Sequence, residues 1–156
     1  MNELVQKVLS SSGIQFSIEP NSVPDTIKIE AHDLLKIGQL LQSDPGLYFD
    51  QLSCVTGIDN GPEAKTLEVI YHFYSIPFHI SLAVKVVLPR ENPEIESLTA
   101  LWQSANWMER EVYDMVGIKF SNHPDLRRIL MPTDWEGYPL RKDYQHQERY
   151  HGIQLD

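Results

Sequence analysis

TLEVIYHFYSIPFHISLAVKVVL, residues 66–88, is the stretch that decides the fold of this 156-residue chain. Hydrophobic side chains occupy every second position from residue 67 to 73 and again from 78 to 88. Because successive side chains of a strand point to opposite faces of a sheet, this period of two predicts two half-buried strands. The short linker Ser75-Ile76-Pro77 places the two strands side by side in an antiparallel pair.

Further strands are predicted before this pair. Residues 47–58 have the composition of a third long strand, and Asp59-Asn60-Gly61-Pro62 has that of a hairpin turn. Two short alternating runs, at 14–18 and 27–29, are separated by a loop between Pro20 and Pro24. The sheet is therefore expected to be mostly antiparallel or mixed.

Two short helices complete the first ninety residues. The first is expected to begin with Asn2 as its N-cap and to end near Gly13, and the second to begin at Asp33 and end at 44–46. Each has apolar residues at helical spacing: Leu4, Val5, Val8 and Leu9 in the first, and Leu34, Ile37, Gly38 and Leu41 in the second. Helices that cover one face of such a sheet make an α+β fold.

A third helix is predicted near the C-terminus. Apolar residues recur at helical spacing over 98–116, and Gly117 stands where a left-handed residue would end the helix. Ser104 and Asn106 are positions at which this helix could be interrupted once.

The last 36 residues show no sustained period, and three prolines, at 124, 132 and 139, prevent a long helix. A long irregular stretch is uncommon inside a compact domain and is typical of a functional loop or a docking segment. We therefore expect an α+β domain at 1–120 and an extended C-terminal docking arm at 121–156, whose order depends on partner chains.

The composition excludes several functions. The chain has 13 basic and 22 acidic residues and a net charge of −9, which argues against nucleic acid or an anionic lipid surface as a partner. Neither a membrane span nor a signal peptide is expected, because no apolar stretch is long enough. The single cysteine, Cys54, cannot supply the ligands of an iron–sulfur cluster, and no glycine-rich nucleotide loop is present.

Glu109 lies in the middle of the apolar stripe of the third helix. A buried carboxylate needs a partner, and the arm offers Arg127, Arg128 and Arg141 for a bidentate ion pair. The alternative is that Glu109 reaches past the edge of the stripe to water.

The opposite face of that helix carries Trp107, Arg110, Glu111 and Asp114. Tryptophan and arginine are enriched at the energetic centres of protein interfaces, so this face is a candidate docking surface. The alternative is that the protein's own arm covers Trp107. A metal-dependent hydrolase site made of Glu111, Asp114 and His123 is a further alternative, although the spacing matches no compact ligand pattern.

Three runs near the C-terminus closely resemble the signature of the thirty-kilodalton subunit of respiratory complex I. They are ANWMEREVYDMVGI at 105–118, HPDLRRIL at 123–130 and WEGYPLRKDY at 135–144. The close resemblance covers about a quarter of the chain, and the part before it matches the family only in outline. Val116 stands where an aromatic residue is common, and the tail after Tyr144 is short.

The resemblance implies a hydrophilic subunit of the peripheral arm of a proton-translocating NADH:quinone oxidoreductase, beside the subunit that forms the quinone cavity. It implies that this chain binds no cofactor, while the whole complex uses FMN, iron–sulfur clusters, NADH and quinone. The residues that match the family motif are expected to fold and dock the subunit: Trp107, Glu109, Arg110, Glu111, Asp114, Gly117, His123, Pro124, Arg127, Arg128, Trp135, Gly137, Pro139, Arg141, Lys142 and Asp143.

The same resemblance implies a place on the cytoplasmic side of the bacterial inner membrane, held there by the quinone-cavity subunit and cluster-bearing neighbours. The equivalent subunit of a membrane-bound nickel–iron hydrogenase, or of a photosynthetic-type complex, is the alternative within the superfamily. The sequence does not distinguish these, because the electron donor would bind another chain.

Overall fold

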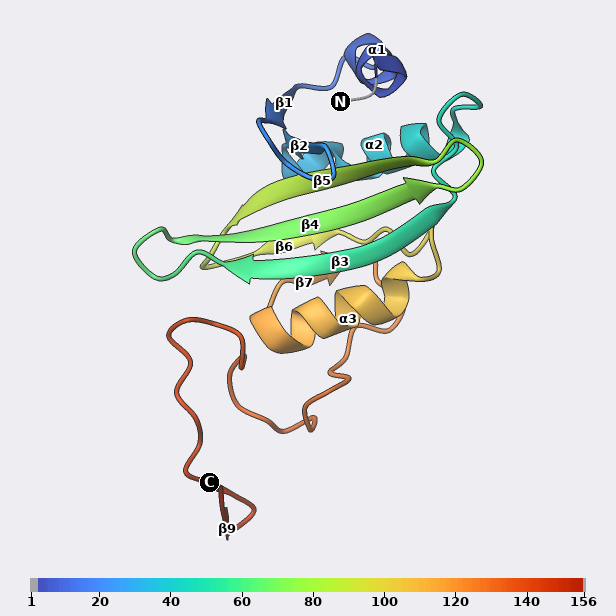
Figure 1. Cartoon of the computed structure of the whole chain (residues 1–156). Coiled ribbons are helices and arrows are strands. Elements are labelled where there is room, and N and C mark those ends of the chain that lie inside the picture. The colour runs from blue at the N-terminus through green and yellow to red at the C-terminus, as the bar shows by residue number, and fades with distance from the viewer. Residues whose placement is uncertain (1–2, 156) are drawn as a thin grey trace.

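The computed structural model describes residues 3–155, which form three helices, a main sheet and two small pairs of strands (Figure 1). The helices and the 3-10 turn are α1 (Glu3–Ser11), η1 (Ala31–Asp33), α2 (Leu34–Ser43) and α3 (Ala105–Val116). The strands are β1 (Phe16–Glu19), β2 (Thr26–Ile29), β3 (Gln51–Asp59), β4 (Thr66–Ser75), β5 (Ile80–Pro89), β6 (Glu94–Glu96), β7 (Lys119–Ser121), β8 (Arg149–Tyr150) and β9 (Ile153–Gln154).

The main sheet has five strands in the order β1-β2-β5-β4-β3. The two predicted hairpins are confirmed, because β3 pairs antiparallel with β4 and β4 with β5. β2 instead runs parallel to β5, with Ile27 beside Val84. The sheet is therefore mixed, and β3 and β1 are its two edges.

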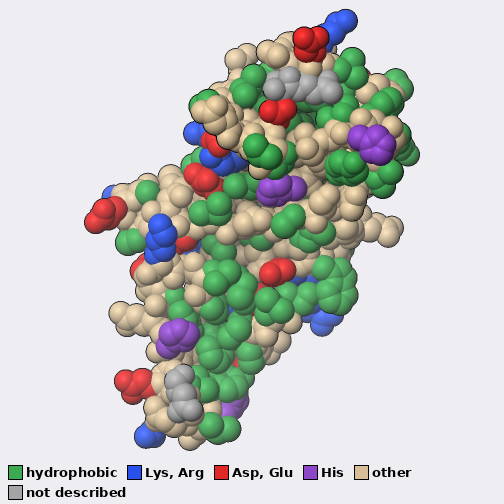
Figure 2. Space-filling model, viewed as in Figure 1, with side chains coloured by type: hydrophobic (Ala, Val, Ile, Leu, Met, Phe, Trp, Pro, Cys, Tyr) green, Lys and Arg blue, Asp and Glu red, His purple; other side chains and the backbone are tan. Residues whose placement is uncertain are grey.

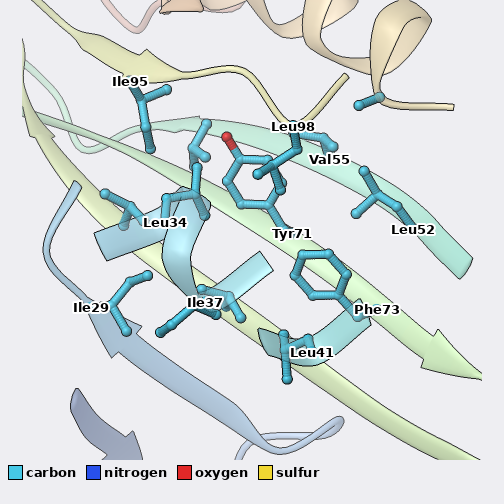
Figure 3. Packing of buried hydrophobic residues seen from close by; sticks show 14 of the residues in the cluster. Ile29, Leu34, Ile37, Leu41, Leu52, Val55, Tyr71, Phe73, Ile95 and Leu98 are labelled. Atoms are coloured by element: carbon cyan, nitrogen blue, oxygen red, sulfur yellow. The ribbon is translucent and has the colours of Figure 1, made fainter. Parts of the chain in front are cut away.

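The core lies on one face of this sheet. The alternating residues of 66–88 confirm the predicted period, since Leu67, Val69, Tyr71 and Phe73 are buried together with the matching residues of β5. Figure 3 shows how Leu34, Ile37 and Leu41 of α2 pack against this face beside Tyr71 and Phe73. The other face carries exposed polar side chains such as those of Lys28, Thr56 and Ser81.

The helix boundaries correct two expectations and leave a third untested. Asp33 occupies the N-cap position of α2, but its side chain makes no capping hydrogen bond, because the 3-10 turn runs directly into the helix. α3 begins at Ala105 rather than Leu98, because 98–104 folds as a turn in which the amide of Trp102 donates to the carbonyl of Leu98 at 2.9 Å. The predicted cap of α1, Asn2, lies outside the described residues.

β6 and β7 have no counterpart among the predicted elements; they are two three-residue strands that pair in parallel and flank α3 in the chain. After Ser121 the chain has neither helix nor strand until Arg149, in agreement with the predicted irregular segment. We call residues 121–156 the arm. None of the helices formed by residues 3–155 is long and apolar enough to cross a membrane.

Candidate docking site on α3 and the arm

α3 lies directly against edge strand β3, and a glycine permits this close approach. A Cβ atom on Gly57 would lie 2.8 Å from Cγ1 of Val112, which is too short for two carbon atoms. The inner face of α3 buries Ala105, Val112, Met115 and Val116, as the apolar stripe predicts. At its C-terminus Gly117 adopts φ +81°, which confirms the predicted left-handed end of the helix.

Glu109 is completely buried, but its partners differ from the expected arginines. Its Oε2 accepts a hydrogen bond from the Ser97 hydroxyl at 2.6 Å, and its Oε1 accepts one from the Leu98 amide at 2.8 Å. The expected ion pair with Arg127, Arg128 or Arg141 is wrong, and so is the alternative in which Glu109 reaches water. The turn at 97–98 supplies the donors instead, and the arginines have other partners.

The environment of Glu109 favours its neutral form. Burial raises the pKa of Glu109 to about 7, and the negative charge of Glu96 adds to this effect, while the hydrogen bonds from Ser97 and Leu98 oppose it. The hydroxyl of Tyr71 is buried and has no hydrogen-bond partner among the described residues. Burial and the charge of Glu109 both raise the pKa of Tyr71. Figure 3 shows the Tyr71 hydroxyl directed toward the segment that carries Leu98.

Asp114 was expected on the exposed face of α3, and the structure instead buries it beneath the arm. Its Oδ2 accepts three backbone hydrogen bonds of 2.7–2.9 Å from the amides of residues 129–131. Its Oδ1 accepts a hydrogen bond from Nη1 of Arg128 at 2.7 Å. We call this arrangement the Asp114 cluster, and it attaches the first part of the arm to α3.

The Asp114 cluster stabilises a charge in a buried position. Burial by itself would raise the pKa of Asp114, but the amide of Met131, the guanidinium of Arg128 and the other two amides outweigh it and hold the pKa below its ordinary value. A buried carboxylate enclosed by four donors is not available to a metal. The metal site of Glu111, Asp114 and His123 is therefore wrong, and within residues 3–155 no group of three His, Cys, Asp or Glu side chains could hold a metal ion.

Arg128 connects the Asp114 cluster to the second half of the arm. Its Nη2 donates to the carbonyl of Gly137 at 2.8 Å, and its guanidinium lies 5.3 Å from the centre of the Tyr138 ring. The guanidinium of Arg141 lies 4.8 Å from the centre of the same ring, and its Nε donates to the carbonyl of Val116 at 2.7 Å. Tyr138 is thus held by two arginines at the C-terminal end of α3.

A second buried aspartate holds the arm farther along the chain. Asp59, at the end of β3, accepts hydrogen bonds of 2.8 Å from the amides of Gly61 and Lys142 and is ion-paired with Arg90. Arg90 is also paired with Asp143 of the arm. Although burial raises the pKa of Asp59, these hydrogen bonds and the charge of Arg90 lower it overall. Sequence reasoning missed both residues, because Asp59 has the appearance of a turn residue before Asn60-Gly61 and Arg90 belongs to no motif.

Trp107 remains on the surface, with 67% of the residue exposed, so the alternative in which the arm covers it is wrong. The guanidinium of Arg110 lies 5.7 Å from the centre of its ring and donates to the carbonyls of residues 127 and 128 at 3.2 and 3.5 Å. His123 donates from Nε2 to the carbonyl of Asn106 at 3.1 Å, while its Nδ1 accepts the amide of Asp125. These two hydrogen bonds give His123 a structural role, because they join the first turn of α3 to the start of the arm.

The remaining predicted residues lie around this core of contacts. Trp135 donates from Nε1 to the hydroxyl of Tyr144 at 3.0 Å, and Gly137 packs under the ring of Tyr144. Pro124 lines a shallow hollow beside Trp107. Arg127 and Glu111 are exposed, and Pro139 is partly buried. Figure 2 shows hydrophobic side chains along the lower part of the molecule, where the arm lies. Leu130, Leu140 and Ile153 are exposed apolar residues of the arm.

These observations define an α+β protein whose motif residues hold its own C-terminal segment in place and leave a tryptophan and several aliphatic side chains on the surface. A family model described as "Respiratory-chain NADH dehydrogenase, 30 Kd subunit" matches residues 27–150. The chain belongs to this family.

Two of the curated relatives of this chain are named as the C subunit of NADH-quinone oxidoreductase. The chain is 48% identical over 120 residues to the C subunit of NADH-quinone oxidoreductase from Chloroherpeton thalassium, a match that covers 76% of this chain and 49% of the relative. It is 46% identical over 120 residues to the relative of the same name in Chlorobium phaeobacteroides, covering 76% of this chain and 72% of the relative. The matched region therefore spans about half the length of the Chloroherpeton relative.

Two solved structures share the fold. The trypsin-resistant fragment (1-134) of Nqo5 superposes with a TM-score of 0.63 at 27% identity, covering 79% of this chain and 96% of that one. A chain of the membrane-bound sulfane sulfur reductase, an archaeal respiratory membrane complex, superposes with a TM-score of 0.77 at 19% identity, covering 92% of this chain and 84% of that one. The first supports the predicted α+β fold within the family, and the second shows the fold alone.

Proposed function

We propose that this chain is a cofactor-free structural subunit of the peripheral arm of a proton-translocating NADH:quinone oxidoreductase. It would dock beside the quinone-cavity subunit and cluster-bearing neighbours, on the cytoplasmic side of the bacterial inner membrane. FMN, iron–sulfur clusters, NADH and quinone would be bound by other chains. The family membership and the names of the relatives support this proposal.

The observation that carries the proposal is the exposed Trp107, with the guanidinium of Arg110 over its ring. Both residues lie on α3, which the sheet holds on one side and the arm on the other. Large aromatic rings paired with arginine dominate binding energy at protein interfaces, and a rigid support lowers the entropic cost of binding. Because Glu109 and Asp114 are hydrogen-bonded by this chain's own donors, these two motif residues of α3 serve its internal structure. The Ser97 hydroxyl lies within hydrogen-bond reach of the Glu109 carboxylate, but both residues are buried and a substrate could not reach them.

We further propose that the chain divides into a folded body, residues 1–120, and a docking arm, residues 121–156. The contacts at Asp114 and Asp59 support a refinement in which 122–144 lies against the body, while the segment after Tyr144 is available to partners. Leu130 and Leu140 are exposed apolar side chains of the arm and are available to partners as well.

Affinity purification of the tagged chain from detergent-solubilised membranes tests the function. Recovery of a flavin-binding chain and the quinone-cavity subunit is the expected result. Recovery of a nickel-binding large subunit would instead support the hydrogenase-type alternative. Purification of the chain alone from membranes that contain the assembled oxidoreductase would contradict the proposal.

A further inference from the structure

We propose that the free edge of β3, next to α3, binds one extended segment of a partner subunit, which adds a sixth strand to the main sheet. This inference rests on the proposed function, because it requires that the chain works inside an assembly. It concerns the groove between β3 and α3, which Leu140 of the arm borders, and not the Trp107 face.

The free edge of β3 is an unusual feature of this sheet. β3 is nine residues long, and β4 is its only strand neighbour among the described residues, so its other edge has main-chain donors and acceptors outside any ladder. Proteins usually protect such edges with short strands, charges, proline, bulges or a covering helix or loop. β1, the opposite edge, has four residues, ends in Glu19 and precedes Pro20. β3 has no charged residue and no proline from Gln51 to Ile58. The irregularity at Ser53 and the hydrogen bond from the Ser104 hydroxyl to the Leu52 carbonyl protect the start of the strand, so residues 54–58 are its open part.

A groove runs along this edge. Residues 53–57 of β3 line it in succession, together with Met108, Glu111 and Met115 of α3 and with Leu140 of the arm, around a cavity of about 230 Å³. Because successive side chains point to opposite faces of a sheet, a groove that touches five consecutive residues must follow the main-chain edge. The wall on the α3 side is rich in methionine, a side chain that adapts to varied partners.

The chemistry of the groove defines its occupant. Unpaired main-chain groups are satisfied by an extended backbone, and alternate side chains of that backbone would meet Met108 and Met115. Glu111 is exposed on the groove wall and forms no ion pair within the described part of the chain. The occupant is therefore an extended segment with alternating apolar side chains and a lysine or arginine placed against Glu111.

A partner segment fits this edge better than a second copy of the chain or its own C-terminus. Each copy carries a net charge of −9, so two copies would meet against long-range repulsion. The C-terminal strands β8 and β9 pair with each other and lie away from β3 at the far end of the arm (Figure 1).

Amide hydrogen exchange of the full chain, isolated and within the purified membrane complex, tests the inference. We expect exchange in the peptide that spans Gln51–Asp59 to slow by about tenfold or more in the complex, while the peptide of β1 is unchanged. Equal exchange in both states, in a complex that retains this chain, would overturn the inference and leave the proposed function intact. Slow exchange already in the isolated chain, accompanied by a dimer in sedimentation, would also overturn it in favour of a second copy.

A pair of lysine variants gives an independent test on the two edges. Thr56→Lys places a positive charge at an exposed position of β3. Ile18→Lys places the same charge at an exposed position of the other edge strand, β1, and serves as the matched control. We expect Thr56→Lys to lower recovery of the assembled complex by about tenfold and Ile18→Lys to leave it unchanged. Circular dichroism and thermal unfolding establish that both variants fold. Equal recovery of two folded variants would contradict the inference, and a chain that never co-purifies with other subunits would remove the proposed function together with it.

Discussion

Nη1 of Arg128 lies 2.7 Å from Oδ1 of Asp114, and the two side chains are 13% and 0% exposed. This ion pair joins α3 to the arm where water has almost no access. Three backbone amides also donate hydrogen bonds to the carboxylate. Asp114 therefore fixes the position of the start of the arm as well as neutralising the charge of Arg128.

Asp114→Asn should lower the free energy of unfolding by about 3–5 kcal/mol, because it leaves the charge of Arg128 buried without its counter-ion. Urea denaturation followed by circular dichroism measures the loss. Asp125→Asn is the matched control, since the side chains of Asp125 and its ion-pair partner Arg127 are 48% and 68% exposed. That control should change stability by less than about 1 kcal/mol. Similar small losses for both variants would mean that the cluster contributes little.

Limited trypsin digestion of the isolated chain should cleave first after exposed Arg149 and spare the bond after Arg128, because Arg128 is held in the Asp114 cluster. In Asp114→Asn the bonds after Arg127 and Arg128 should become early sites. Mass spectrometry of the fragments identifies the order. Early cleavage after Arg128 in the unaltered chain would indicate that the arm detaches readily without partners.

Gly117→Ala should destabilise the chain for two separate reasons. The residue has φ +81°, and a new Cβ would lie 2.6 Å from the ring of Tyr138. Gly13→Ala is the control for backbone strain alone, since Gly13 has φ +73° and no described atom within 4 Å of a new Cβ. We expect Gly13→Ala to cost about 1–2 kcal/mol and Gly117→Ala clearly more. In a Tyr138→Ala background, Gly117→Ala should lose less stability than it does in the unaltered chain. An equal loss in both backgrounds would show that contact with the Tyr138 ring is not the reason for the larger effect.

Glu109→Gln should change how stability depends on pH. In the native state Glu109 has a pKa of about 7, against an ordinary value of 4.5, so between these two values it holds a proton that the unfolded chain has released. The proton on Glu109 therefore stabilises the native state fully below pH 4.5, and this stabilisation is lost as the pH rises through 7. The free energy of unfolding should fall by roughly 3 kcal/mol in total. The glutamine variant lacks this loss and should gain stability relative to the unaltered chain at about pH 8.

Thermal unfolding of both proteins from about pH 4.5 to 8.5 measures the difference. Asp59 and Asp114 act in the opposite sense, because their lowered pKa values make stability fall only below about pH 4, so the two effects occupy separate windows. Parallel curves for Glu109→Gln and the unaltered chain over the whole range would show that Glu109 titrates normally.

Trp107→Ala should weaken assembly without weakening the fold. The residue is 67% exposed, so its loss removes little buried area, whereas an aromatic centre of an interface contributes about 2 kcal/mol or more to binding. Co-purification of partner subunits at matched expression gives the readout. Tyr48→Ala, at a residue 49% exposed outside the α3 surface, is the control. Equal recovery of the two variants would exclude Trp107 from the interface.

The sheet could be predicted from the sequence because its signal is local. Residues 66–88 alternate with the period of a strand, and the turns on either side have the right composition, so two antiparallel pairings follow directly. The parallel pairing of β2 with β5 has no such local sign, since parallel neighbours are set by tertiary packing. Helical spacing also favours a buried Glu109, although it leaves open that the side chain reaches water, and the structure buries it.

The partners of the buried carboxylates could not be predicted. Ser97 lies twelve positions from Glu109, and the amides that bind Asp114 belong to the backbone, which has no sequence signature. An arginine is a reasonable partner to expect for a buried glutamate. Arg128 instead pairs with Asp114, which follows Glu109 by one helical turn and one residue on α3. Helical spacing assigns Asp114 to the face away from the sheet, and the arm covers it there.

The parallel pairing of β2 with β5 also bears on biosynthesis. Ile27 and Val84 are neighbours in the sheet but 57 positions apart in the chain. A chain made from its N-terminus releases β2 long before β5 exists, so β1 and β2 have no sheet to join at first. β3, β4 and β5 are consecutive and can form a meander from nearby contacts, which close faster than distant ones. We therefore expect the strands synthesised first to be the last to enter the sheet.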